Sequence, residues 1–180
     1  MASRVSRMSA RGPVFKTVLL GEGGVGKTSL AVRYTEDRFD ERMKMTIGVN
    51  FASKKIHFED KEITMLIWDL GGQPRFQEVV TSYFVGSKLG IAVYEVPTPF
   101  TLYRLTDWIA KLHDSVPDCG LFVVGNKVDE RRADGSVTLG QAKDFAGQYQ
   151  APVFEVSAKT GQGVKELFES AARFLMSKSR

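Results

Sequence analysis

The sequence predicts an α/β fold, in which a six-stranded and mostly parallel sheet carries about five helices on its two faces. Apolar runs of strand length alternate with segments of helical periodicity from Val14 onward. Two of these runs are separated by only three residues, which suits a hairpin and therefore one antiparallel edge strand. The 180 residues contain no internal repeat and no low-complexity segment, so we expect one domain.

The predicted domain spans residues 14–176, between a basic tail (1–13) that we expect to be disordered and a short end (177–180). The predicted strands are residues 14–20, 47–58, 62–69, 89–96, 119–126 and 151–157. Helical periodicity marks residues 29–39, 102–112, 142–149 and 164–175, and an irregular helix is expected within 71–86. Thr138 and Gln141 form a capping-box pattern ahead of residues 142–149.

Composition limits the classes of protein to consider. A hydrophobic content of 43% and a charged content of 26% are typical of soluble globular proteins, and no apolar run approaches the length of a membrane span. The single cysteine, Cys119, excludes an internal disulfide framework and is expected to be buried. The net charge of +4 includes basic ends that could meet nucleic acid or anionic lipid. Solvated tails are the simpler interpretation, and we expect no nucleic-acid partner.

A glycine-rich stretch, GEGGVGKTS at residues 21–29, lies between the first predicted strand and the first predicted helix. It fits the phosphate-loop pattern G-x-x-x-x-G-K-[ST], and strand, loop and helix is the context that this pattern requires. Glycines let backbone N–H groups turn toward phosphate oxygens, and the helix start adds the positive end of its dipole. The lysine supplies a charge for the outer phosphates, and the hydroxyl after it can ligate Mg²⁺. The expected nucleotide-binding residues of this loop are Gly21, Glu22, Gly23, Gly24, Val25, Gly26, Lys27, Thr28 and Ser29.

The loop after the third predicted strand adds acidic and glycine residues at the carboxyl edge of the sheet, where ligands bind in such folds. Asp69 ends an apolar strand, where a carboxylate is costly unless it is paired or close to a metal ion. It could therefore hold Mg²⁺, directly or through a water. Gly72, at D-x-x-G spacing, can bring its backbone N–H to a terminal phosphate.

The loops after the last two predicted strands carry groups suited to a purine base. A carboxylate at Asp129 can accept hydrogen bonds from N1–H and the 2-amino group of guanine, and adenine lacks both donors. The SAK segment at 157–159 would contact the base from the other side. Each motif is short and common alone, but their order, each at the end of its own strand, indicates a guanine-nucleotide site. The expected base-binding residues are Asn126, Lys127, Asp129, Ser157, Ala158 and Lys159.

Together these motifs resemble those of the Ras-superfamily small GTPases over residues 14–176, and the sequence is most similar to the Rab branch. TIGVNF at 46–51, LIWDLGGQPRF at 66–76 and SYFVG at 82–86 carry this similarity. The resemblance implies a small-GTPase (G) domain, GTP and GDP as ligands, and Mg²⁺ as cofactor. It also implies protein effectors, an exchange factor and a GTPase-activating protein as partners.

Further roles follow from the resemblance. It implies that Thr46 binds Mg²⁺ and senses the γ-phosphate, and joins Thr28 and Asp69 in the metal site. It implies that Gln73 is the catalytic residue that orients the attacking water. Phe39 would pack edge-on against guanine. The residues implied in effector binding are Ile47, Phe51, Trp68 and Tyr83, although these aromatics, like Phe39, could instead belong to the core.

The sequence departs from the Rab pattern at several positions. Gly71 stands where Rab proteins usually have alanine, which should loosen the loop. Pro74 replaces the usual acidic residue and pushes Gln73 toward an extended conformation, which could help or spoil its placement. Met43 lies where Gα subunits carry a catalytic arginine, so we expect slow hydrolysis that an activating protein accelerates.

Two functions from different classes stay open, a GTP-hydrolysing switch and a GTP-bound interaction scaffold with negligible hydrolysis. An ATP-using P-loop kinase is disfavoured by Asn126 and Asp129. Residue 2 is alanine and the sequence ends in SKSR, so neither a myristoylation signal nor a prenylation box is present. We expect a cytoplasmic monomer, in which a lipid anchor is either absent or part of a tail that has been removed, and weak peripheral contact with membranes through the basic ends stays open.

Overall fold

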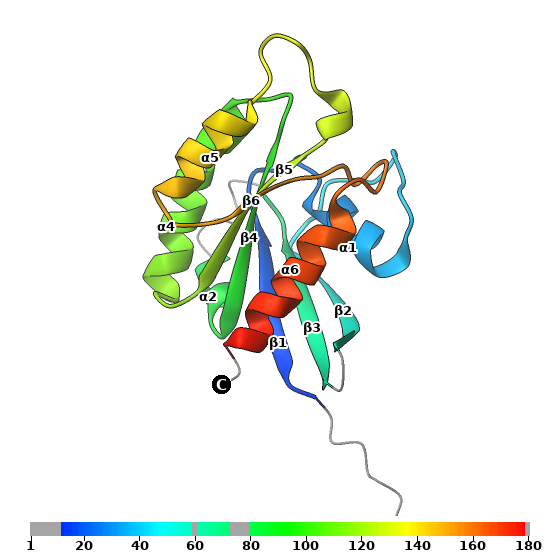
Figure 1. The fold of residues 1–180 in the computed structure, drawn as a ribbon, viewed down its shortest axis with the longest axis vertical. Coiled ribbons are helices and arrows are strands. Elements are labelled where there is room, and N and C mark those ends of the chain that lie inside the picture. Colours follow the sequence, from blue (N-terminus) through cyan, green and yellow to red (C-terminus); the bar gives the residue numbers. More distant parts are fainter. Residues whose placement is uncertain (1–11, 59–60, 73–79, 179–180) are drawn as a thin grey trace, which may run out of the picture.

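The computed structural model describes residues 12–58, 61–72 and 80–178, and within these ranges it contains one six-stranded sheet (Figure 1). The order of the strands is β2-β3-β1-β4-β5-β6. Only the β2–β3 pair is antiparallel, and it lies at one edge of the sheet. The strands are β1 (Val14–Leu20), β2 (Val49–Phe58), β3 (Lys61–Leu70), β4 (Ser87–Glu95), β5 (Gly120–Asn126) and β6 (Val153–Glu155). The predicted fold class, with its hairpin edge, is confirmed.

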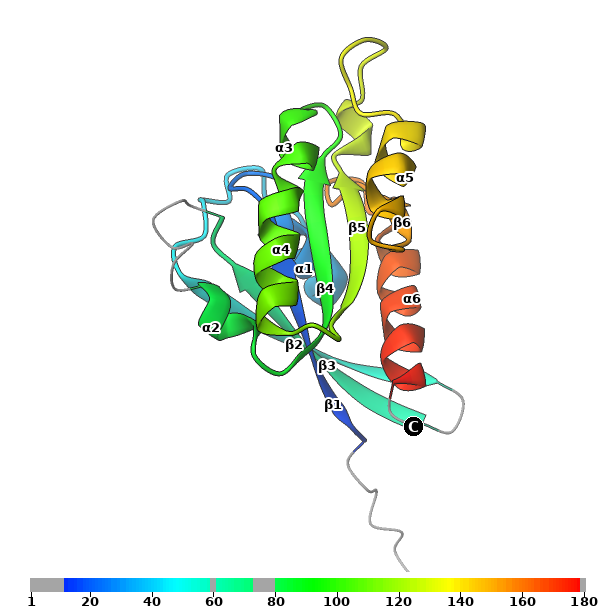
Figure 2. The same cartoon turned by 90° about the vertical axis from the view of Figure 1, so that its left-hand side faces the viewer.

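Helices cover both faces of the sheet, each over its own apolar core (Figures 1 and 2). Helices α1 and α6 pack on one face, and α2, α4 and α5 pack on the other. The helices are α1 (Lys27–Glu36), α2 (Val80–Phe84), α3 (Phe100–Tyr103), α4 (Leu105–Ser115), α5 (Leu139–Gly147) and α6 (Val164–Ser177), and a 3₁₀ turn, η2, spans Val128–Glu130.

Local chemistry explains where the elements begin and end. The capping box at the start of α5 is confirmed, since Gln141 N donates to Thr138 Oγ1 (3.2 Å) and Thr138 N donates to Gln141 Oε1 (2.9 Å). The helix predicted at 102–112 is divided into α3 and α4, but Arg104 between them keeps helical dihedrals (φ −65°, ψ −18°). The two therefore follow one nearly continuous path.

The last strand, β6, is shorter than the predicted 151–157. It pairs with β5 over three residues, and flanking backbone bonds from Val123 N to Pro152 O (3.0 Å) and from Val156 N to Gly125 O (2.8 Å) extend the contact. The first helix begins at Lys27, earlier than the predicted 29, because Gly26 precedes it in a left-handed conformation. These differences leave every predicted loop at its expected edge of the sheet.

The carboxyl ends of the parallel strands meet at one end of the molecule (the upper end in Figure 1), where the glycine loop follows β1. The start of β1 at Val14 and the end of α6 at Ser177 lie at the opposite end. Among the described residues, none of the helices has the length and apolar character needed to span a membrane.

Candidate functional site

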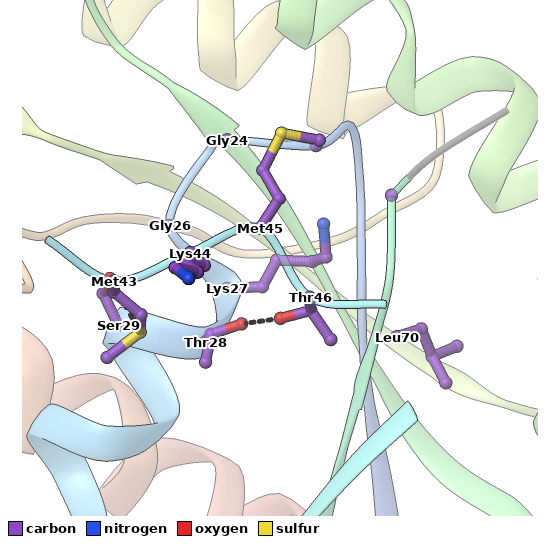
Figure 3. Close-up of a pocket in the computed structure, with 12 residues that line it drawn as sticks. Gly24, Gly26, Lys27, Thr28, Ser29, Met43, Lys44, Met45, Thr46 and Leu70 are labelled. Carbon is purple, nitrogen blue, oxygen red and sulfur yellow. Dashed lines mark hydrogen bonds between the residues drawn. The ribbon is translucent and has the colours of Figure 1, made fainter. Parts of the chain in front are cut away.

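Two cavities lie side by side along the loops that follow β1, β3, β5 and β6, and they share residues of the glycine loop and Met43. The first, drawn in Figure 3, has a volume of about 110 Å³, and the second has about 320 Å³. The first is lined by Gly23, Gly24, Gly26, Lys27, Thr28, Ser29, Met43, Lys44, Met45, Thr46, Leu70 and Gly72. The second is lined by Gly24, Gly26, Ser29, Phe39, Asp40, Glu41, Met43, Asn126, Lys127, Asp129, Glu130, Ala158 and Lys159.

The glycine loop wraps the start of α1 in a conformation that only glycine adopts readily. Gly26 precedes the helix with φ of 94°, and a Cβ there would lie 2.3 Å from Asn126 Nδ2. No side chain caps this helix among the described residues, so its first N–H groups lack a side-chain acceptor. Such a helix start attracts anions.

Lys27 is buried beside the loop, and its ammonium group donates to Gly21 O and Glu22 O at 2.8 Å each. Burial lowers the pKa of Lys27 to about 8, although Asp69 and the Glu22 carboxylate oppose this shift. A buried ammonium whose hydrogen-bond partners among the described residues are two carbonyls is poorly compensated. An added anion in the first cavity would compensate it.

The hydroxyls of Thr28 and Thr46, which line the first cavity, meet there (Figure 3), and the Asp69 carboxylate lies directly beside them. Thr28 Oγ1 lies 2.5 Å from both Thr46 Oγ1 and Asp69 Oδ2, and Thr46 Oγ1 lies 3.4 Å from Asp69 Oδ2. Asp69 Oδ1 is buried without a hydrogen-bond partner among the described residues. Burial raises the pKa of the Asp69 carboxyl, and the Thr28 hydrogen bond opposes that shift.

These oxygens fit a Mg²⁺ ion, which prefers hard oxygen ligands and is usually held by one or two protein groups together with phosphates. The described residues contain no cluster of three or more His, Cys, Asp or Glu side chains. A cation here would therefore need oxygen ligands from a bound phosphate as well. The residues present fit the predicted magnesium site.

Gly72 brings the end of β3 against the glycine loop. A Cβ at Gly72 would lie 2.3 Å from Gly23 N and 2.6 Å from Gly21 O, so the close approach requires glycine. This contact places the predicted D-x-x-G loop beside the predicted phosphate loop. Gln73 and Pro74, the next two residues, lie outside the described residues.

Asn126 joins the glycine loop to the loop after β6. Its Nδ2 donates to Val25 O (2.9 Å), and its Oδ1 accepts from Ala158 N (3.0 Å). Its side chain is buried, with 1% of its surface exposed. Asn126 thus acts from the protein interior to fix two loops that line the second cavity.

Most of the remaining residues predicted to contact the base line the second cavity, but Ser157 does not. Phe39 is half-buried and packs against the core beside α1 and α6, while it lines this cavity as well. Lys127 forms an ion pair with Glu95, and Asp129 lies exposed in η2. Ser157 is buried, and its Oγ accepts from Thr160 N (3.0 Å).

Lys159 forms a bridge across the mouth of the second cavity. Its ammonium lies 2.7 Å from Glu41 Oε1, and this hydrogen bond raises the pKa of Lys159. Because Glu41 belongs to the segment between α1 and β2, the bridge ties that segment to the loop after β6. Both side chains are at least half exposed, so the bridge contributes little to stability.

Two residues of the predicted phosphate loop, Glu22 and Val25, direct their side chains away from the first cavity, whereas Ser29 lines both cavities. Glu22 Oε1 accepts from Trp108 Nε1 (3.0 Å), which connects the loop to α4. Val25 is fully buried in the core. Ser29 Oγ lies 3.8 Å from Met43 Sδ, between the two cavities. The backbone N–H groups of Glu22 and Val25 are the parts of these two residues that remain available to a phosphate.

The predicted effector aromatics form one surface cluster. The rings of Phe51 and Trp68 meet edge to face at 4.5 Å, Tyr83 lies 6.1 Å from Trp68, and the Lys16 ammonium lies 3.6 Å above the Trp68 ring. Phe51 is 64% exposed and Ile47 is 70% exposed, so neither belongs to the core. Trp68 and Tyr83 are half-buried and pack against the core beside α2 and α4.

The structure brings in residues that sequence patterns did not predict. Met45 reaches over the glycine loop, where its Cε lies 3.3 Å from the Cβ position of Gly23. Arg33 contacts the loop after β6. The position of Met45 beside Thr46 could have marked it, whereas no sequence signal relates Arg33 to a loop 125 residues away.

Comparisons with known proteins agree with this geometry. The sequence model of the Ras family matches residues 16–177. Ras-related protein Rab-18 of Lymnaea stagnalis is 39% identical over 160 residues, which cover 86% of this chain and 76% of that protein. Ras-related protein RABC1 of Arabidopsis thaliana is 38% identical over 159 residues (87% and 74%), and Ras-related protein Rab-21 of Mus musculus is 36% identical over 155 residues (86% and 69%). The chain belongs to the Ras family, as a Rab-like small GTPase.

Proposed function

We propose that this protein is a guanine-nucleotide switch that binds GTP and GDP with Mg²⁺ and hydrolyses GTP slowly. The observation that carries this proposal is the convergence of four loops on two adjoining cavities. One cavity offers N–H groups, an ammonium and hydroxyl and carboxylate oxygens, which suit phosphates and a cation. The other contains Asp129 and Asn126, which suit guanine.

Each set of residues has a task in the proposed site. Lys27 and the backbone of the glycine loop hold the β- and γ-phosphates, and Gly72 N–H contacts the γ-phosphate. The oxygens of Thr28, Thr46 and Asp69 would hold Mg²⁺, directly or through water. When bound, Mg²⁺ neutralises charge that develops on the phosphate oxygens.

The base and ribose end occupies the second cavity. The Asp129 carboxylate accepts hydrogen bonds from N1–H and the 2-amino group of guanine, and the backbone of Ala158 and Lys159 contacts the base from the other side of the cavity. Phe39 and the stem of Lys127 flank the ring. Identification of the nucleotide that co-purifies with the protein tests this assignment, and adenine in place of guanine would contradict it.

Gln73 is the proposed catalytic residue, which orients the attacking water. Because Met43 stands where an arginine could assist in cis, we expect a rate of order 10⁻⁴ per second, which corresponds to a barrier of roughly 22 kcal/mol. An arginine from a GTPase-activating protein would lower that barrier by about 4–7 kcal/mol. Single-turnover phosphate release measures the unaided rate, and a value near one per second would refute the slow switch.

The exposed apolar cluster of Ile47, Phe51, Trp68 and Tyr83 is the proposed effector surface. It adjoins Thr46, so binding of the γ-phosphate by Thr46 can order the neighbouring chain and change this surface. Effectors would then bind the GTP state in a Rab-like trafficking role, with an exchange factor to restore it. A Phe51→Ala variant that bound its partners as well as the wild-type protein would argue against this surface.

A GTP-bound scaffold is the second candidate, and it is favoured by Pro74, which restrains the backbone of the catalytic Gln73. Comparison of phosphate release by the wild-type protein and a Gln73→Leu variant separates the two functions. The switch requires a slower variant, whereas equal rates would support the scaffold.

A further inference from the structure

Arg33, in the second turn of α1, binds the loop that follows β6. Its Nε donates to Ala158 O and its Nη2 donates to Lys159 O, both at 2.8 Å. One planar guanidinium therefore binds two consecutive carbonyls, a geometry that a lysine cannot reproduce. The Arg33 side chain is 17% exposed, so most of its guanidinium group is shielded from water.

The same loop is held from its other side. Ala158 N donates to Asn126 Oδ1 (3.0 Å), while Ala158 O accepts from Arg33. Within the loop, Thr160 N donates to Ser157 Oγ (3.0 Å) and Gly161 N donates to Ser157 O (2.8 Å). The backbone of Ala158 is thus fixed by two side chains that come from two different elements, β5 and α1.

The Arg33 charge acts mainly on these carbonyls. Its ion-pair partner among the described residues is Asp37, whose side chain is 94% exposed, and such pairs are strongly screened. The bond to Ala158 O polarises the peptide group that also contains Lys159 N–H, which strengthens that N–H as a donor. Arg33 can therefore set both the position and the donor strength of the loop.

We propose that Arg33 is a positioning residue for recognition of the 6-oxygen of guanine. This oxygen is an acceptor next to the N1–H group proposed to bind Asp129, and Ala158 and Lys159 line the same cavity as Asp129. Arg33 holds the carbonyls of both residues against the helix that begins at the phosphate loop, and it thereby positions the Lys159 N–H group, since Ala158 N–H is already donated to Asn126. The inference rests on the proposed function and adds a residue that does not touch the ligand.

The test compares release of GDP with release of 6-thio-GDP, which keeps N1–H and the 2-amino group but replaces the 6-oxygen by sulfur, a weak acceptor. Arg33→Met removes both carbonyl bonds. Arg38→Met is the matched control. Arg38 lies just beyond the end of α1, its side chain is 63% exposed, and it pairs with Glu36. Dissociation of each bound diphosphate is followed after addition of excess GTP at fixed Mg²⁺.

We expect Arg33→Met to raise the GDP dissociation rate about tenfold, as loss of charge-assisted hydrogen bonds predicts, and the 6-thio-GDP rate less than twofold. Arg38→Met should leave both rates within twofold of wild type. Arg33→Lys keeps the charge but binds as a point donor, so its GDP rate should rise about threefold. This variant provides a second reading should Arg33→Met fold poorly.

Two results would overturn the inference. One is equal rates for the Arg33 and Arg38 variants, and the other is a similar acceleration of GDP and 6-thio-GDP release, because Arg33 would then support the fold without regard to the 6-oxygen. Failure of the wild-type protein to bind either diphosphate would overturn the proposed function itself. That outcome is recognised without any variant.

Discussion

Replacing Asn126 by alanine should destabilise the protein even when no nucleotide is bound. The change removes two bonds within the protein and leaves Val25 O and Ala158 N buried without a partner. Each unsatisfied buried group costs about 1–3 kcal/mol, so we expect a loss of about 2–6 kcal/mol in the free energy of unfolding. This is a large share of the roughly 5–15 kcal/mol that stabilise a typical domain.

Urea unfolding followed by circular dichroism, with and without a fixed excess of GDP, measures this loss. Bound GDP stabilises the folded state according to its affinity, so a contact between Asn126 and the base would add to the loss only in the presence of GDP. Gln148→Ala is the control, because Gln148 is exposed at the end of α5, and its change should remain within about 0.5 kcal/mol. The reasoning would be refuted if Asn126→Ala lost stability with GDP but not without it.

Three further changes test other parts of the structure. Burial raises the pKa of the Cys119 thiol to about 11. The neutral thiol therefore contributes stability that is complete below pH about 9 and is lost as the pH rises toward 11. Urea unfolding across this range should show the wild-type protein losing about 3 kcal/mol, a loss that the Cys119→Ala variant should not show. A Cβ at Gly71 would lie 2.8 Å from Thr46 O, so Gly71→Ala should cost about 1–2 kcal/mol in thermal unfolding. The control Gly147→Ala, in open space on α5, should be neutral or stabilising. The Gly23→Val variant should still bind GTP but should hydrolyse it more slowly in single-turnover experiments. An unchanged rate would mean that the proposed catalytic glutamine, Gln73, does not contribute to hydrolysis.

The parts of the fold and site that sequence predicts are those set by local patterns. Apolar runs predicted the strands, and the parallel arrangement of those strands then predicted that the glycine loop, Asp69, Asn126 and Ala158 would meet at one edge. The capping box at Thr138 was likewise readable, because its two bonds join residues three apart.

Contacts between distant elements could not be predicted in this way. The sequence alone predicts that Arg33 is an exposed charge near the end of a helix. In the structure, packing of α1 against α6 brings Arg33 to the loop after β6. Glu22 occupies a variable position of the phosphate-loop pattern. Its hydrogen bond from Trp108 depends on how α4 packs on the sheet, which the pattern does not predict. The short length of β6 has the same origin, since neighbouring β5 decides how many residues pair.

The direction of the last helix has a practical consequence. Helix α6 starts at Val164, just past the loop that lines the second cavity, and its 14 residues carry the chain roughly 20 Å away, to Ser177. That end lies opposite the carboxyl ends of the parallel strands (Figure 1), where the loops lining both cavities are found, so a tether fixed there would leave both cavities facing solution. Sensors that immobilise the protein there would leave the proposed nucleotide site open to solution, whereas attachment near the 130–136 loop would lie beside the second cavity, which Glu130 lines.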